Sequence, residues 1–204
     1  MRITALLFGL TALALTGVAA ANDEAEAFAK RTIDKGFAIL RDDTGGTVGR
    51  RARFHAFILE YVDARKSAMF ALGTYRRGAD TAAVESYAAA FTEYAIEIYE
   101  SRLENYKSAT LNVVGSIENK PGDTTVNTLG TAPNLRDPVR IAFRLQATGG
   151  TFKIADVQVE GIWLSIELRD EFAALLSANG GNIAGLTRTL VQRTANLQNG
   201  KPAT

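Results

Sequence analysis

The hydrophobic and polar positions between Phe152 and Gly181 change from the period of a strand to the period of a helix. In the first part, Val157 and Val159 alternate with more polar residues, which is typical of a strand with one covered face. In the second part, apolar residues recur at helical spacing, at Leu168, Phe172, Leu175 and Leu176. We expect this helix to end at Asn179-Gly180-Gly181, because these residues tolerate the left-handed conformation that follows many helices.

The same stretch makes a prediction about Trp163, the one tryptophan of the sequence. If the strand continues to this residue, Val157, Val159, Gly161 and Trp163 share one side-chain face, because side chains in a strand alternate with a period of two. The indole would then lie beside the gap that Gly161 leaves on the apolar face of the sheet.

The chain before this stretch predicts a series of helices. A first helix begins near Asp23, where Glu26 gives a capping-box-like start, and Thr44-Gly45-Gly46 ends it. The second helix has a broad apolar face, made of Phe54, Phe57, Ile58, Tyr61 and Val62. Asp63 then caps a short third helix that ends at Gly73.

The longest predicted helix starts near Asp80 or Thr81. Its apolar stripe consists of Val84, Tyr87, Phe91, Tyr94 and Ile98. Its acidic residues are expected mostly on the outside: Glu93, Glu97, Glu100 and Glu104.

The period then changes and predicts an antiparallel meander of about four strands. The first strand carries Leu111, Val113 and Ile117, and a strong turn signal at Pro121-Gly122 separates it from a second strand around Thr124 to Thr131. The third strand alternates most cleanly, with a dry face of Val139, Ile141, Phe143 and Leu145. In the fourth strand the apolar phase shifts, so either a bulge lies near Ala155-Asp156 or both faces are partly covered.

A last helix follows Asn182, which can cap it. Its inward residues are expected to be Ile183, Leu186, Leu190, Val191 and Leu197. Helices, then strands, then helices place the chain in the α+β class, with helices packed on one curved antiparallel sheet.

The first residues, 1–21, have the pattern of a signal peptide. Arg2 supplies the charged start, an apolar run follows, and Ala19-Ala20-Ala21 resembles a cleavage site. We therefore expect an exported single domain of residues 22–204. The sequence has no cysteine, so this domain is expected to depend on its core and not on disulfides. With 23 Lys and Arg against 22 Asp and Glu, the charge suggests no nucleic-acid partner and no polybasic membrane anchor.

Candidate chemistry is sparse. His55 is the one histidine and is expected at the surface, and with no cysteine present the sequence predicts neither a metal site nor catalytic residues. Carboxylates remain as candidates for an acid or base, at Asp156, Glu160, Glu167, Asp170 and Glu171. The competing interpretation is solvated charge, or an ion pair with Arg169 or Arg144.

Six short motifs follow one another along nearly the whole chain after residue 21. They are Tyr61-Val62-Asp63, Phe70-Ala71-Leu72-Gly73-x-Tyr75, Tyr99-x-x-Arg102-Leu103-x-x-Tyr106, Asp156-Val157-x-Val159-Glu160-Gly161-Ile162, Arg169-x-Glu171-Phe172 and Asn179-Gly180-Gly181. Each motif is weak alone, but in this order they resemble the MlaC family, also called toluene-tolerance proteins.

The resemblance implies a soluble periplasmic carrier that binds a diacyl glycerophospholipid as cargo, without a cofactor, in an apolar cavity between the helices and the sheet. It also implies two partners: an outer-membrane lipoprotein–porin complex and an inner-membrane MCE-domain ABC transporter complex. The carrier would shuttle lipid between them and so maintain outer-membrane lipid asymmetry. We expect a monomer that does not act as an enzyme.

The residues expected to bind lipid are apolar and come from both halves of the chain: Phe57, Tyr61, Met69, Leu72, Phe91, Tyr94, Ile98, Ile141, Phe143, Val157, Val159, Trp163, Phe172 and Leu176. We expect Trp163 to touch the lipid near the pocket mouth, unless it is a plain core residue. Two alternatives stay open. The cargo is a hopanoid or another polycyclic lipid, or the protein is a small-molecule isomerase or hydrolase that uses Asp156 or Glu160.

Overall fold

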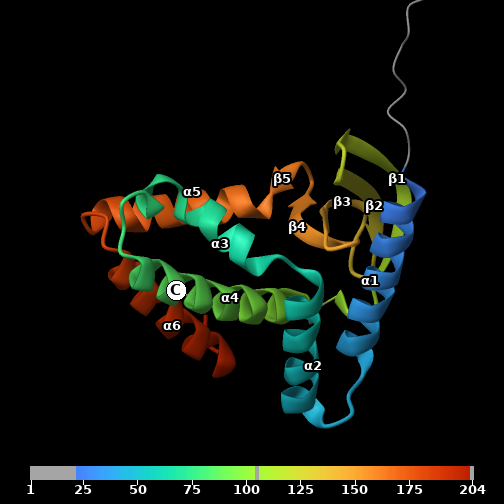
Figure 1. Ribbon diagram of the computed structural model, residues 1–204. Helices are drawn as coiled ribbons and strands as arrows, with labels where there is room; N and C mark the ends of the chain where they lie inside the picture. Colours follow the sequence, from blue (N-terminus) through green and yellow to red (C-terminus); the bar gives the residue numbers. More distant parts are fainter. Residues whose placement is uncertain (1–21, 104–105, 203–204) are drawn as a thin grey trace, which may run out of the picture.

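The computed structural model describes residues 22–103 and 106–202 and has the expected α+β architecture, with helices packed on one antiparallel sheet (Figure 1). The predicted signal peptide, 1–21, and Glu104 lie outside the described residues. The helical elements are α1 (Asp23–Arg41), α2 (Gly46–Tyr61), α3 (Ala64–Leu72), the 3-10 helix η1 (Gly73–Arg76), α4 (Thr81–Leu103), α5 (Leu164–Ala178) and α6 (Ile183–Gln198).

The sheet of the described residues has five antiparallel strands in the order of the chain. They are β1 (Thr110–Lys120), β2 (Asp123–Thr131), β3 (Val139–Thr148), β4 (Thr151–Val159) and the two-residue β5 (Ile162–Trp163). The sequence predicts about four strands, and the additional strand is the short β5. The predicted bulge is confirmed, because Arg144 pairs with Asp156 while Leu145 pairs with Ile154, which leaves Ala155 extra.

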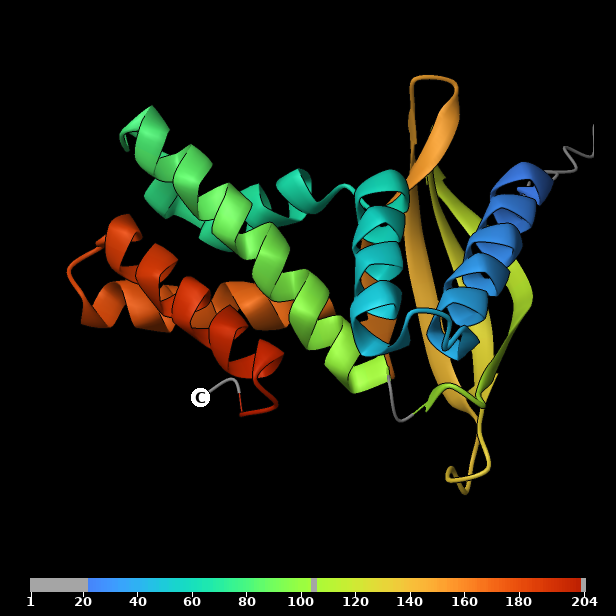
Figure 2. The same cartoon turned by 90° about the horizontal axis from the view of Figure 1, so that it is seen from below.

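Helix α1 packs on one face of the sheet, which we call the inner face. Small residues at Ala25 and Ala29 let the helix approach closely, and Phe28 lies between them against Val126 and Leu145 of the sheet. Helix α2 runs back beside α1, and Figure 2 shows these two helices near the sheet with α3 to α6 grouped on the far side of α2.

The start of α1 is fixed by hydrogen bonds. The helix is capped by Asn22 and not by Asp23 as expected, because the Asn22 side chain accepts from the backbone N–H of Ala25 at 2.9 Å. The backbone N–H of Asn22 in turn donates to Ser116 of β1, and the Ser116 hydroxyl donates to Glu26. The first turn of α1 is therefore joined directly to the edge strand.

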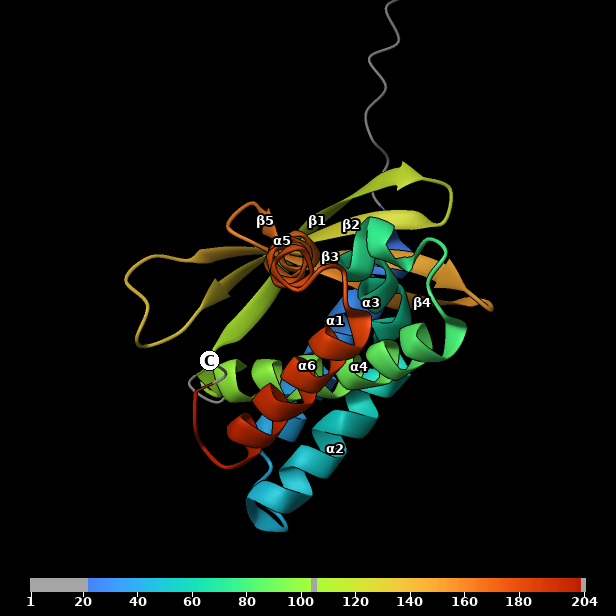
Figure 3. The ribbon, with the colours of Figure 1, turned by 90° about the vertical axis from the view of Figure 1, so that its left-hand side faces the viewer.

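Helices α3 to α6 form a second, separate core. Tyr87, Phe91 and Phe172 are 0–2% exposed, and Phe172 meets each of the other two rings edge-on at 6.1–6.4 Å. Helices α4 and α6 make the most extensive helix–helix contact and cross in Figure 3. Helices α3 and α5 contact β4, and just before α3, Val62 forms an isolated bridge with Ile154 of that strand.

The prediction that the acidic residues of α4 face outward is wrong for Glu97 and Glu100, each 5% exposed. The physical reason is Arg51 of α2, whose guanidinium lies 3.2 Å from Glu97 and 3.3 Å from Glu100. Burial raises the pKa of Glu100, and the arginine opposes that shift. Buried carboxylates thus fix α4 to α2.

Two residues expected to be inward are exposed. Val191 on α6 is 56% exposed, because α6 uses the narrower stripe of Ile183, Leu186 and Leu190 against its neighbours. Ile117 on β1 is 47% exposed, because a register shift between Val113 and Gly115 moves it to the outer face of the sheet.

The expectation that Trp163 shares a face with Val157 and Val159 is also wrong. The chain turns at Glu160 and Gly161, which both have positive φ, and returns as β5. Trp163 consequently pairs with Gln158 and lies on the outer face of the sheet.

A buried carboxylate on the outer face leads to a prediction about stability. Asp123 is 1% exposed and accepts hydrogen bonds from Arg144, Gln146 and Asn119. The hydrogen bond from Arg144 is the largest effect and holds the pKa of Asp123 well below its ordinary value of 3.8. We expect Asp123→Ala to lower the free energy of unfolding by about 2 kcal/mol at pH 7, measured by urea denaturation.

The pH dependence and a control complete this test. Because the folded-state pKa of Asp123 is lowered, its stabilisation is present above about pH 4 and is lost as the pH falls further. The difference between the two proteins should therefore shrink below that pH. Asp34→Ala, which removes an exposed i,i+4 pair with Lys30, should change little. An equal loss of stability in both variants would contradict this account of Asp123.

Candidate functional site

The inner face of the sheet is largely apolar, and its residues on β3 and β4 are more fully covered at one end than at the other. At the covered end, Leu145, Ile154 and Phe152 are 0–9% exposed beneath α1. Two residues from Leu145 on β3 and, past the bulge, three residues from Ile154 on β4, Phe143 pairs with Val157 on the same face, and both are only partly buried. The change in burial occurs within one pair of strands, so it reflects the helix above and not the sheet.

We call the uncovered part the open end of the inner face. It consists of partly exposed apolar residues from β1, β3 and β4: Leu111, Val113, Ile141, Phe143, Val157 and Val159. Between these strands, on the same face, Val126 and Thr128 of β2 lie opposite Phe143 and Ile141 and are 0–1% exposed, so only the flanking strands β1, β3 and β4 are partly exposed here.

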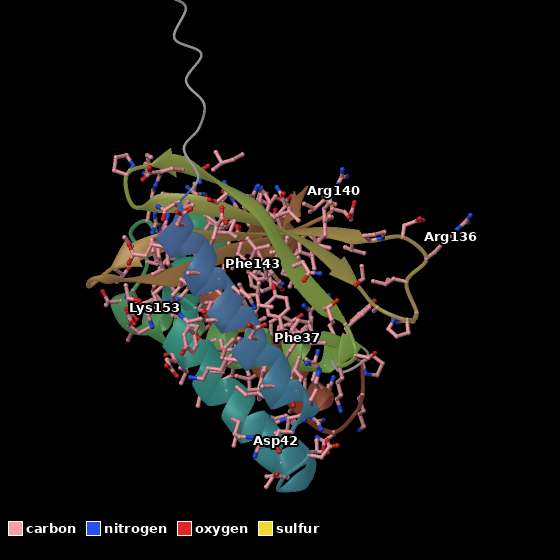
Figure 4. All side chains as sticks on the ribbon, turned by 90° about the vertical axis from the view of Figure 1, so that its right-hand side faces the viewer. Phe37, Asp42, Arg136, Arg140, Phe143 and Lys153 are labelled. Atoms are coloured by element: carbon pink, nitrogen blue, oxygen red, sulfur yellow. The ribbon has the colours of Figure 1, made fainter. Side chains whose placement is uncertain are left out.

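Helix α1 lies over the open end without covering it. Its second half packs through Leu40 against α2 and α4 instead of against the sheet, in a cluster that includes Phe54, Phe57 and Ile96. Phe37 is only partly buried at the edge of that cluster. Figure 4 shows Phe37 and Phe143 in the space between α1 and the strands, so apolar side chains from a helix and from the sheet both line it.

Tyr61, at the end of α2, connects the covered end to the helices. Its ring lies 6.1 Å from Phe28 and 5.1 Å from Phe57. Its hydroxyl accepts from Lys35, and that hydrogen bond, with a second from Lys35 to Glu60, raises the pKa of the lysine. The aromatic ring faces the interior while its polar end reaches an exposed rim.

The structure separates the residues expected to bind lipid into groups. Phe57, Tyr61, Ile141, Phe143, Val157 and Val159 lie at or beside the inner face. The others on α3, α4 and α5 belong to the second core: Met69, Leu72, Phe91, Tyr94, Ile98, Phe172 and Leu176. Leu72, Phe91, Tyr94, Phe172 and Leu176 are at most 2% exposed, so the second core presents little free surface.

Sequence reasoning did not select Leu111, Val113 or Phe37 for the site. The alternation of Leu111 and Val113 predicts a strand, but it does not show which surface that strand joins. The missing information was the register, which aligns Val113 with Thr128 and so places β1 on the same surface as Ile141.

Trp163 lies in a different place, on the wall of a pocket of about 140 Å³ between α3, the outer face of the sheet and the start of α5. Phe70 and Ile166 also line this pocket. The volume is smaller than an ordinary small-molecule site of about 300 Å³ or more.

Three of the five candidate acids, Asp156, Glu160 and Glu171, are engaged in structural hydrogen bonds. Helix α5 has no capping side chain of its own at Trp163, and Asp156 of β4 takes that role by accepting from the backbone N–H of Ser165 at 3.2 Å. Asp156 also accepts from the Ser165 hydroxyl. Glu160 accepts from Arg140, and Glu171 is paired with Arg193.

Other chemistry is equally limited in the described residues. His55 is partly exposed and lies 3.0 Å from Glu93, at the surface as expected. Within 22–103 and 106–202, no group of three or more His, Cys, Asp or Glu side chains is placed to hold a metal ion. Over the same ranges, no helix combines the length and apolar character that a membrane crossing requires.

Comparisons with known proteins point to one family. A family model described as MlaC protein matches residues 30–192. Among solved structures, a phospholipid-binding protein from Ralstonia solanacearum, in complex with a phospholipid, is similar at a TM-score of 0.73 and 21% sequence identity. The similarity covers 86% of this chain and 99% of that one, so the two share their fold.

The capping role of Asp156 can be tested directly. We expect Asp156→Ala to lower the free energy of unfolding by about 1 kcal/mol, because the orphan N–H at the start of α5 loses its acceptor. Urea denaturation measures this change, with the exposed Asp170→Ala on the same helix as the control. Unchanged stability in Asp156→Ala would show that the cap contributes nothing.

Proposed function

Because the chain belongs to the MlaC family, we propose that it is a carrier that binds a glycerophospholipid with its acyl chains against the open end of the inner face. The observation that carries this proposal is the partial exposure of Phe143 and Val157 on a face whose other end is fully covered. Apolar side chains left accessible inside a fold mark a place for an apolar ligand.

The choice of cargo has independent support. The Ralstonia solanacearum protein with the same fold was solved in complex with a phospholipid. In this chain the open end offers apolar contacts and no buried charge, which suits acyl chains. The polar rim at Lys35 and Tyr61 gives a headgroup hydrogen-bonding partners at the edge.

The energetics suit a carrier. Each buried CH₂ gains ~0.8 kcal/mol, so two chains of about sixteen carbons gain roughly 25 kcal/mol gross. Release into water is therefore negligible, whereas transfer into a bilayer or another apolar surface is close to balanced. Such a protein delivers its lipid by direct contact with a membrane complex.

The family suggests which complexes take part. We propose that residues 1–21 direct export to the periplasm. There the protein, as a monomer, shuttles lipid between the outer-membrane lipoprotein–porin complex and the inner-membrane MCE-domain ABC transporter complex. This traffic would maintain the lipid asymmetry of the outer membrane.

Native mass spectrometry with lipid extraction tests the cargo. We expect protein purified from cells without detergent to carry about one diacyl phospholipid per chain. The extracted mass separates a diacyl lipid from a polycyclic one such as a hopanoid. Consistent absence of bound lipid would contradict the proposal.

A substitution on the open end tests the location. We expect Phe143→Asp to abolish lipid loading, because a carboxylate among acyl chains remains unpaired. Leu129→Asp is the matched control, since Leu129 is on the neighbouring strand but is 37% exposed and aligned with Arg140 on the outer face. Circular dichroism verifies folding of both variants. Normal loading in folded Phe143→Asp would place the acyl chains elsewhere.

Tryptophan quenching by a lipid brominated along one acyl chain distinguishes the two faces. Bromine quenches indole emission only near contact, so Trp163, on the outer face, should keep its emission in loaded protein. The double variant Trp163→Phe with Phe143→Trp moves the one tryptophan to the open end and should be quenched. Strong quenching of Trp163 and none at position 143 would reverse this assignment.

A further inference from the structure

A pocket lined by arginines lies apart from the inner face, between α3, η1 and α5. Its volume is about 180 Å³, and its wall includes Arg76 and Arg77 from η1 and the residue after it, and Arg169 from α5. Phe70 and Met69 of α3 complete one side. Segments nearly a hundred residues apart in sequence thus bring guanidinium groups to one small concavity.

These arginines, unlike several others among the described residues, have no acidic partner. Arg65, Arg144 and Arg193 are paired with Glu85, Asp123 and Glu171 respectively. In the part of the chain that the structure describes, neither Arg76, Arg77 nor Arg169 has a carboxylate within salt-bridge distance. Asp80, the nearest acid along the chain to Arg77, caps α4 by accepting from Ala83 at 2.9 Å.

The geometry of Arg169 is set by its neighbours. Its guanidinium carbon lies 5.3 Å from the centre of the Phe70 ring, a cation–π contact that orients the planar group. Gly73, with φ of 60°, faces the arginine, and a Cβ there would lie 3.6 Å from Arg169 Nε. Glycine is favoured there by its positive φ, and it lies in van der Waals range of the guanidinium.

We propose that this pocket binds a phosphate group. Guanidinium groups recognise phosphate through paired N–H donors, and clustered positive charges without carboxylates gain most from an anion. The group could be carried by a free phosphate compound or by the headgroup of an anionic lipid at a membrane surface. The site is separate from the proposed acyl-chain surface and does not depend on it.

A bound phosphate would relieve the mutual repulsion of the guanidinium groups, so it should stabilise the folded protein in proportion to its binding. Removing the charges of Arg76 and Arg77 should leave the stability of the anion-free protein unchanged or slightly higher, whereas Arg169→Gln also loses the cation–π contact with Phe70. That response distinguishes a binding site from a structural cluster, in which removal of an arginine would be destabilising.

The test uses the full mature chain and two probes. Pyrophosphate is titrated by calorimetry, and binding to phosphatidylglycerol vesicles is compared with binding to phosphatidylcholine vesicles. The variants are Arg76→Gln with Arg77→Gln, and Arg169→Gln alone. The matched control for net charge is Arg31→Gln with Arg188→Gln, on exposed positions of α1 and α6. Phe143→Asp is included to separate this site from the acyl-chain surface.

We expect both pocket variants to weaken binding at least tenfold, while the control and Phe143→Asp retain it. Arg169→Lys should recover only part of the loss, because lysine keeps the charge but not the planar pair of donors. If the pocket variants weaken pyrophosphate binding, the ligand is a free phosphate compound. If the pocket variants weaken only the binding to phosphatidylglycerol vesicles, the ligand is a lipid headgroup.

The proposal is overturned if neither probe binds, or if the control variant weakens binding as much as the pocket variants do. The second result would mean that binding follows net charge alone. Because Arg76→Gln with Arg77→Gln should still carry lipid in native mass spectrometry, failure here does not affect the proposed carrier function.

Discussion

The position of α1 over the sheet determines what the rest of the molecule can do. Its start is joined to β1 through Asn22, Ser116 and Glu26. Its end is joined to the segment just before β1 through Arg41, which donates to the backbone carbonyls of Lys107 and Ala109 at 2.7 and 2.8 Å. Held at both ends, the helix packs closely through its alanines at one end of the inner face. It turns its larger apolar residues toward α2 and α4 at the other.

This arrangement separates the residues that stabilise the fold from the surface proposed to bind lipid. The covered end of the inner face and the second core around Phe172 hold the fold together, and their large side chains are almost fully buried. Buried charge links these parts, since Arg51 of α2 lies between Glu97 and Glu100 of α4. The open end can therefore remain partly exposed without loss of the folded state, and an apolar ligand can occupy it without displacing the core.

Much of the fold could be predicted from periodicity and capping residues. Asp63 and Asn182 cap their helices as expected, and the phase shift in β4 correctly indicated the bulge at Ala155. These features are local, so the sequence alone contains the physical reason for them. Membership of the MlaC family was also predictable, because its motifs occur in order between Tyr61 and Gly181.

The site was harder to predict because it depends on register and on packing between distant elements. Trp163 lies on the outer face, and not on the predicted inner face, because the chain turns at Glu160 with a positive φ, a conformation that is rare outside glycine. Phe91 and Phe143 look alike in sequence, yet one is 2% exposed in the second core and the other lies at the open end. Periodicity predicts that both side chains point inward. It does not show whether the space around each side chain is filled by other side chains of the protein.

Photo-crosslinking from a phospholipid with a diazirine near the end of one acyl chain tests the central claim most directly. The labelled peptides are located by mass spectrometry after loading of the protein. We predict labels on β3, β4 and the second half of α1, around Phe143, Val157 and Phe37. Labels confined to α4 and α5, around Phe91 and Phe172, would show that the acyl chains enter the second core and would contradict this account.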